Sequence, residues 1–211
     1  MAQKLARHDI DTTTLTGLNA LEESFYSLSG NNSPSIIHIS THGFYYPDTV
    51  SDEYRKNMMY SATGDIRFKY ADDPLLRSGL ILAGGNNTWK GLPRPEGVED
   101  GILTAREVSN MNLLNTELVV LSACQTGQGD VKGSEGVEGL QRGFKMAGVH
   151  YIIMSLWQVP DKETTEFMEH FYSLWPGGEL SIRDAFRETQ LKMMHKYPNE
   201  PYKWAGFVLM E

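Results

Sequence analysis

A strand that ends abruptly in small and polar residues constrains this chain more than any other feature. The stretch is residues 116–129, TELVVLSACQTGQG. Its apolar run over 118–121 is typical of a strand buried on both faces of a parallel sheet. Small or polar residues follow, among them Cys124, the only cysteine of the chain. In open α/β sheets, ligands bind in the crevice beyond the strand ends, so the sequence places Cys124 beside such a crevice.

A second stretch of similar design carries an imidazole. Residues 35–43, SIIHISTHG, predict a strand that holds His38 inside it and ends at His42 and Gly43. Within the strand, His38 is interpreted as a core histidine with satisfied hydrogen bonds. At the strand end, the glycine after His42 favours close approach by a ligand. An imidazole accepts a proton near neutral pH, and a thiol paired with such a base becomes a good nucleophile.

Two other interpretations of Cys124 stay open from the residues alone. In the first, the thiol is a small apolar group packed under the sheet. In the second, Cys124 is a redox sensor whose reactivity does not need His42. Residues 42 and 124 are far apart along the chain, so only folding to a common sheet edge could pair them.

Several further stretches, in a fixed order, have the character of one family. They are IIHISTHGFYYP, PLLRSGLILAGGNN, EDGILTAREV, LVVLSACQTGQGD, GSEGVEGLQRGFKMAG, YIIMSLWQVPDKETTEFMEHFY and YKWAGFVLME. On these stretches the chain resembles the CHAT domain, a branch of the caspase-like cysteine peptidases that also includes caspases, metacaspases, gingipains and separase. The Ala-Cys-Gln triplet agrees with part of the caspase signature, whereas Ser122 and Thr126 depart from it.

The resemblance implies a fold and a reaction. The fold is α/β, a caspase-like three-layer α/β/α sandwich with a mostly parallel central sheet. The reaction is hydrolysis of a peptide bond in a protein or peptide substrate by a Cys-His dyad of Cys124 and His42. The backbone N–H groups of Gly43 and Cys124 are expected to hold the oxyanion. No metal site and no cofactor are expected, while the calcium requirement of some relatives is left open by the sequence.

A different class of function stays open beside the peptidase. CHAT domains commonly occur joined to tetratricopeptide repeats or other sensor modules, and this chain shows no such 34-residue repeat. Under this second hypothesis, the domain is an interaction or scaffold module, or a peptidase that is silent until a regulatory partner binds.

Asp161 has two interpretations. By residue type it is an N-cap for the helix that follows it. By resemblance, SLWQVPDKET is similar to a separase segment that forms an acidic pocket, although Gln158 replaces an acid there. A carboxylate in such a pocket selects arginine or lysine through charge-assisted hydrogen bonds.

Composition narrows the class of protein. The 211 residues predict a polar lead-in over 1–14 and a single domain over 15–211. A net charge of −8 argues against a nucleic-acid binder, which would show a basic face. A single cysteine excludes an internal disulfide and a cysteine-based zinc cluster. The sequence shows no membrane-spanning apolar run and no signal peptide at its start, so we expect a cytoplasmic protein without membrane contact.

Local patterns predict the remaining elements. The glycines that follow Cys124 match neither a P-loop nor a dinucleotide fingerprint. The excursion over 44–70 is interpreted as a lid or, equally, as a variable surface loop. Helices are expected over 16–30 with Thr16 as cap, over 104–111 with a Thr104–Glu107 capping box, over 134–148, and from Ser181 to about Tyr197; strands are expected over 76–83, 151–156 and 204–210.

Overall fold

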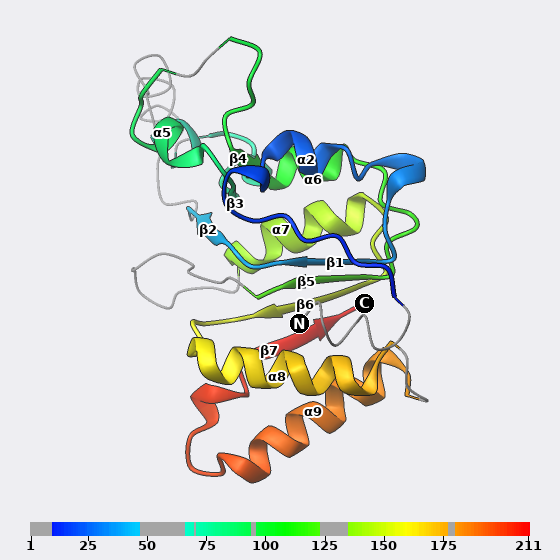
Figure 1. Cartoon of the computed structure of the whole chain (residues 1–211). Coiled ribbons are helices and arrows are strands. Elements are labelled where there is room, and N and C mark those ends of the chain that lie inside the picture. The colour runs from blue at the N-terminus through cyan, green and yellow to red at the C-terminus, as the bar shows by residue number, and fades with distance from the viewer. Residues whose placement is uncertain (1–9, 47–65, 70, 94–95, 123–134, 177–179) are drawn as a thin grey trace.

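Two sheets organise the domain (Figure 1). The computed structural model describes residues 10–46, 66–69, 71–93, 96–122, 135–176 and 180–211. The strands are β1 Ile36–Ile39, β2 His42–Tyr45, β3 Ser78–Ile81, β4 Ile102–Thr104, β5 Leu118–Leu121, β6 Tyr151–Ser155 and β7 Phe207–Met210. The helices are α2 Glu22–Tyr26, α4 Ile66–Lys69, α5 Gly85–Trp89, α6 Ala105–Ser109, α7 Glu135–Met146, α8 Asp161–Leu174 and α9 Ile182–Lys196, with 3₁₀ turns η2 Gly17–Asn19, η3 Gly30–Asn32, η4 Pro74–Leu76 and η5 Pro201–Lys203.

The larger sheet is mostly parallel. Its strand order is β1-β5-β6-β7, and β1, β5 and β6 run parallel, while β7 is antiparallel to β6. All four residues of β5 are buried, as its apolar run predicts. The smaller sheet has the order β2-β3-β4 and is antiparallel throughout.

The larger sheet is covered by helices on both faces. Side chains alternate between the faces of a strand, and two buried clusters result. The first contains Ile37, Ile39, Val119, Leu121, Ile152 and Met154. The second contains Leu118, Val120, Ile153 and Phe207. Residues of α6 and α7 complete the first cluster, and residues of α8 and α9 complete the second, on the opposite side in Figure 1. The expected three-layer arrangement with a mostly parallel central sheet is confirmed.

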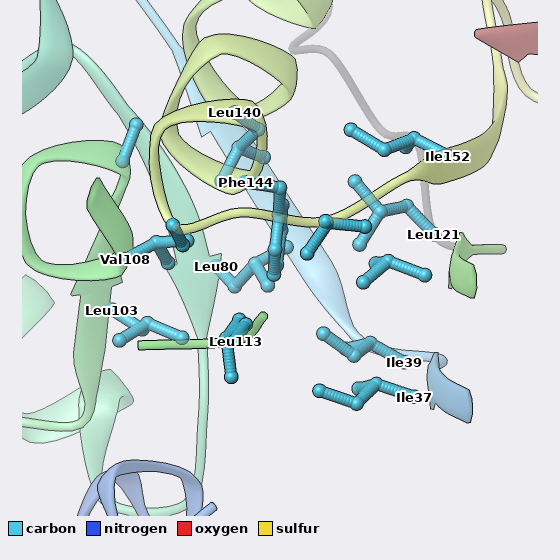
Figure 2. Packing of buried hydrophobic residues seen from close by; sticks show 14 of the residues in the cluster. Ile37, Ile39, Leu80, Leu103, Val108, Leu113, Leu121, Leu140, Phe144 and Ile152 are labelled. Carbon is cyan, nitrogen blue, oxygen red and sulfur yellow. The ribbon is translucent and has the colours of Figure 1, made fainter. Parts of the chain in front are cut away.

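Phe144 on α7 lies at the centre of the first cluster (Figure 2). It is fully buried, and its ring meets the ring of Phe25 edge to face, with 6.4 Å between centroids. Figure 2 shows Phe144 between α7 and the strand residues Leu121 and Ile152, which belong to the same cluster. This contact joins α7 to the strand that precedes Cys124.

Three of the expected helices show a predicted residue at one terminus. The hydroxyl of Thr104 accepts from the backbone N–H of Glu107, whose carboxylate accepts from the backbone N–H of Thr104, so the capping box before α6 is confirmed. Ser181 caps α9 by accepting from the N–H of Asp184. Gly148, at φ +102°, follows the end of α7, where a left-handed residue favours glycine.

The predicted helix over 16–30 is wrong. The chain there forms η2, the short α2 and η3, and Thr16 precedes η2 without a side-chain capping bond. A tertiary backbone hydrogen bond takes the place of a helical one, since the carbonyl of Ala20 accepts from the N–H of Ala83. The buried carboxylate of Glu22, in α2, accepts from the N–H of Gly101. Burial raises the pKa of Glu22 to about 7.

Two strands are shorter than predicted, because 3₁₀ turns take up residues beside them. The strand expected over 76–83 forms only from Ser78 to Ile81, after η4. The strand expected over 204–210 begins at Phe207, after η5. The helix expected over 134–148 is confirmed from Glu135, and residue 134 lies outside the described residues.

The burial of Phe144 predicts a large stability effect. Phe144→Ala should lower the free energy of unfolding by about 3–5 kcal/mol, because it removes a fully buried ring and leaves a cavity between α7 and the sheet. Urea denaturation followed by circular dichroism measures this change. Met146→Ala on the same helix is the matched control, since Met146 is 54% exposed, and should change stability by no more than about 0.5 kcal/mol. Equal losses in both variants would contradict the assigned core.

Candidate active site

The carboxyl ends of β1 and β5 lie side by side (Figure 1). The two strands pair in parallel with Ile39 opposite Leu121, and the backbone N–H of Ser122 donates to the carbonyl of Ile39 at 3.0 Å. His42 is the third residue after Ile39, and Cys124 is the third residue after Leu121 in the sequence. Cys124 itself lies outside the described residues.

The sequence predicts that His42 ends the strand that contains His38, and this prediction is wrong. The first strand ends at Ile39, and His42 begins β2, which pairs with β3 in the smaller sheet. The hydroxyl of Thr41 donates to the carbonyl of Ile81 and fixes the step from one sheet to the other. His42 lies opposite Ile81 and is exposed, and Gly43 follows it in β2. The change of sheet therefore leaves His42 near the end of β1 but on a different strand.

His38 is the satisfied core histidine that the sequence predicts. Its Nδ1 lies 3.0 Å from the hydroxyl of Tyr172 on α8, and its Nε2 lies 2.9 Å from the hydroxyl of Ser122. Burial lowers the pKa of His38 to about 4. The imidazole is therefore neutral at pH 7.

The connection from β6 to α8 begins at the same edge of the sheet, because β6 is parallel to β5. It carries Trp157, which is 38% exposed and whose indole N–H donates to the carbonyl of Tyr202 at 2.9 Å. A Cβ on Gly206 would lie 2.7 Å from the indole ring, so only glycine leaves room for Trp157 there. The tryptophan is thus held by the chain that leads into β7.

Asp161 is exposed and is the first residue of α8. Its N-cap interpretation is wrong: Pro160 occupies the N-cap, its carbonyl accepts from the N–H of Thr164, and no side chain caps the helix. A carboxylate in the first turn is still stabilised by the helix dipole. Within the described residues, Asp161 forms no hydrogen bond or ion pair with His42.

Sequence reasoning missed that Ser122 and Tyr172 are the partners of His38. A signal was present for Tyr172, since it falls on the apolar face of α8 with Phe167, Met168 and Phe171. A buried tyrosine hydroxyl requires a hydrogen-bond partner. The partner could not be named without the packing of α8 on β1.

Neither a metal site nor a membrane-spanning helix is present in the described residues. In these parts of the chain, no group of three or more His, Cys, Asp or Glu side chains is arranged to hold a metal ion. Among the helices described, none is both long enough and apolar enough to cross a membrane.

The architecture and the sequence together define the family. A mixed α/β domain with a mostly parallel sheet between helical layers has the architecture of the caspase-like proteins. Residues 2–211 match the CHAT domain, and the chain belongs to that family.

Two curated relatives are similar over half of this chain. Tetratricopeptide repeat protein 28 of Mus musculus is 32% identical over 112 residues, which are 52% of this chain. Tetratricopeptide repeat protein 28 of Homo sapiens is 31% identical over 116 residues, which are 54% of this chain. In both cases the match spans only 4% of the relative's length.

The burial of His38 predicts how stability depends on pH. Its pKa is about 4 in the folded protein and 6.5 in the unfolded chain, so the unfolded chain binds more protons between these values. The contribution of His38 to stability is therefore complete above pH 6.5 and declines as the pH falls to 4, by roughly 2–3 kcal/mol. His38→Gln should abolish this part of the decline in urea denaturation between pH 7 and 4.

The exposed His195 on α9 provides the control. His195→Gln should keep the pH dependence of the wild type, because the His195 side chain is exposed and its replacement alters no buried group. An unchanged pH dependence in His38→Gln would show that His38 is not held neutral by burial.

Proposed function

We propose that this protein is a cysteine endopeptidase that hydrolyses peptide bonds with a dyad of Cys124 and His42. The observation that carries the proposal is the parallel pairing of β1 with β5, in which Ser122 bonds to Ile39. In the sequence, His42 is three residues beyond Ile39 and Cys124 is three residues beyond Leu121. Membership of the CHAT family, which is related to caspase-like peptidases, supports the same reaction.

The exposure of His42 suits it to proton transfer. In the proposed reaction His42 takes the proton of the Cys124 thiol, and the thiolate attacks the substrate carbonyl. The negative charge moves to the carbonyl oxygen, where the N–H groups of Gly43 and Cys124 stabilise it. His42 then protonates the leaving amine, and water hydrolyses the thioester to restore the thiol. His38 is unsuited to this role because its pKa is low and both ring nitrogens are already bonded.

Substrate choice is assigned to Asp161. Its carboxylate is exposed at the start of α8, after the strand β6 that neighbours β5. We propose that it binds arginine or lysine before the scissile bond, since an anionic site favours a cation there. The single free thiol fits a reducing, cytoplasmic location.

A silent interaction or scaffold module is the second candidate. The curated relatives are named as tetratricopeptide repeat proteins, and this chain corresponds to a small part of them. A repeat module is therefore a suitable regulatory partner, and the isolated domain would then work as a docking or signalling unit, with or without cleavage.

Labelling of Cys124 tests the dyad. An electrophilic peptide ending in arginine should label the wild type rapidly, Cys124→Ala not at all, and His42→Ala at least 100-fold more slowly, the usual contribution of a positioned base. Mass spectrometry measures the labelling. Thermal unfolding should be nearly the same for all three proteins, because neither variant removes an assigned core residue.

Other outcomes would redirect the assignment. A large loss of stability in Cys124→Ala, without labelling of the wild type, would indicate a packed thiol. Labelling that is rapid but independent of His42 would indicate a redox thiol. A folded protein that neither an arginine nor an aspartate probe labels would favour the scaffold module.

The role of Asp161 predicts a change in specificity. Asp161→Asn should slow labelling by the arginine probe roughly tenfold or more relative to an aspartate probe, because it removes the charge that pairs with arginine. Asp72→Asn is the control, since Asp72 is an exposed carboxylate before η4. If both variants keep the wild-type ratio of the two rates, Asp161 does not set specificity.

A further inference from the structure

Three side chains form a continuous hydrogen-bonded chain at the end of β5. Tyr172 on α8 bonds to Nδ1 of His38, and Nε2 of His38 bonds to the hydroxyl of Ser122. The hydroxyl of Ser122 also donates to the carbonyl of Ile39 at 3.3 Å. This series of hydrogen bonds extends from helix α8 on one face of the sheet, through His38 in β1, to Ser122, the first residue after β5.

The donors in this chain have one consistent direction. If the Ser122 hydroxyl donates to Ile39, it accepts from Nε2–H of His38, and Nδ1 then accepts from the hydroxyl of Tyr172. Every polar hydrogen of the three side chains is then used. In the reverse direction the Tyr172 hydroxyl would accept from Nδ1–H, and its own hydrogen would find no acceptor among the described residues, although a buried hydroxyl needs one.

Burial and further hydrogen bonds hold the three hydrogen-bonded side chains in place. Tyr172 is fully buried, and its ring packs against His38 with 5.8 Å between centroids. Ser122 is held twice by Ile39, through its backbone N–H and through its hydroxyl. The position of Ser122, where the polypeptide leaves β5, is therefore set by packing on α8 as well as by the hydrogen bonds between the strands.

We infer that His38 is a positioning residue: held by Tyr172, it fixes Ser122 and so the direction in which the chain leaves β5 toward Cys124. This inference rests on the proposed function, because the residue it serves is the proposed nucleophile. His38 acts through Ser122 and takes no proton in the reaction. Since its pKa is about 4, the imidazole stays neutral and keeps the same donor direction throughout the physiological pH range.

A double-mutant cycle tests whether His38 acts through Ser122. The measured quantity is the rate at which iodoacetamide alkylates Cys124 at pH 7, and a single cysteine makes this rate specific. His38→Leu and Ser122→Ala should each slow alkylation roughly threefold to tenfold, the effect of one lost hydrogen bond. The double variant should be no slower than the slower single variant, because both remove the same contact.

Ser155→Ala provides the matched control. Ser155 ends the neighbouring strand β6 as Ser122 follows β5, and it is not part of the hydrogen-bonded chain. Its alkylation rate should stay within about twofold of the wild type. Rates that fall equally in Ser155→Ala, rates that multiply in the double variant, or rates that do not change would each overturn the inference.

A spectroscopic test does not depend on any variant of His38. Nitrogen-15 NMR of the imidazole should show the proton of His38 on Nε2 in the wild type between pH 5 and 8. Tyr172→Phe, which keeps the ring and removes the donor, should shift the Nδ1 resonance. A wild-type protein with the proton on Nδ1 would overturn the assigned direction.

Failure of the inference can be told apart from failure of the proposed function. If His42→Ala leaves the pH profile of alkylation unchanged, the dyad is wrong, while non-additivity between His38 and Ser122 would still support positioning. If His42→Ala changes the profile and the cycle is additive, the dyad stands and the positioning role is wrong.

Discussion

The pairing of β5 between β1 and β6 is the constraint on which the rest of the domain depends. All four side chains of β5 are buried, and they alternate between a cluster under α6 and α7 and another under α8 and α9. A strand buried on both faces must be apolar, so it can carry polar chemistry only beyond its end. The same parallel register brings the end of β1 beside the end of β5. Core and candidate site are thus consequences of one strand ladder.

Polar atoms at this edge are arranged by two different means. The smaller sheet takes His42 away from β1 and leaves it exposed, because β2 pairs with β3 and Thr41 bonds to Ile81. His38, inside β1, is instead turned toward α8 and bonded on both ring nitrogens. Two histidines four residues apart therefore have opposite environments, and burial is the main cause of the low pKa of His38. This contrast is why only His42 is assigned a part in proton transfer.

Sequence patterns predicted the elements whose side chains decide their own structure. The apolar run of β5, the capping box of Thr104 and Glu107, and the cap of α9 all appeared as expected. The predicted helix over 16–30 failed because the backbone carbonyl of Ala20 accepts from the N–H of Ala83, a partner far away in the chain. The prediction of Asp161 as an N-cap was wrong because the helix begins one residue earlier than predicted, with Pro160 at the N-cap. The error over 16–30 comes from a tertiary hydrogen bond that local propensity does not contain.

The sequence by itself indicated the family and the fold class through the resemblance of its motifs to the CHAT domain, and it supplied the candidate residues. Apolar periodicity, a local property of the chain, located most of the strands and helices. Only the tertiary structure decided that His42 starts a second sheet, that Asp161 lies exposed in the first turn of α8, and that His38 joins Tyr172 to Ser122. Each of these facts depends on contacts between residues far apart in sequence. Such contacts are fixed by packing and by the need to satisfy buried polar groups, and no pattern along the chain specifies them.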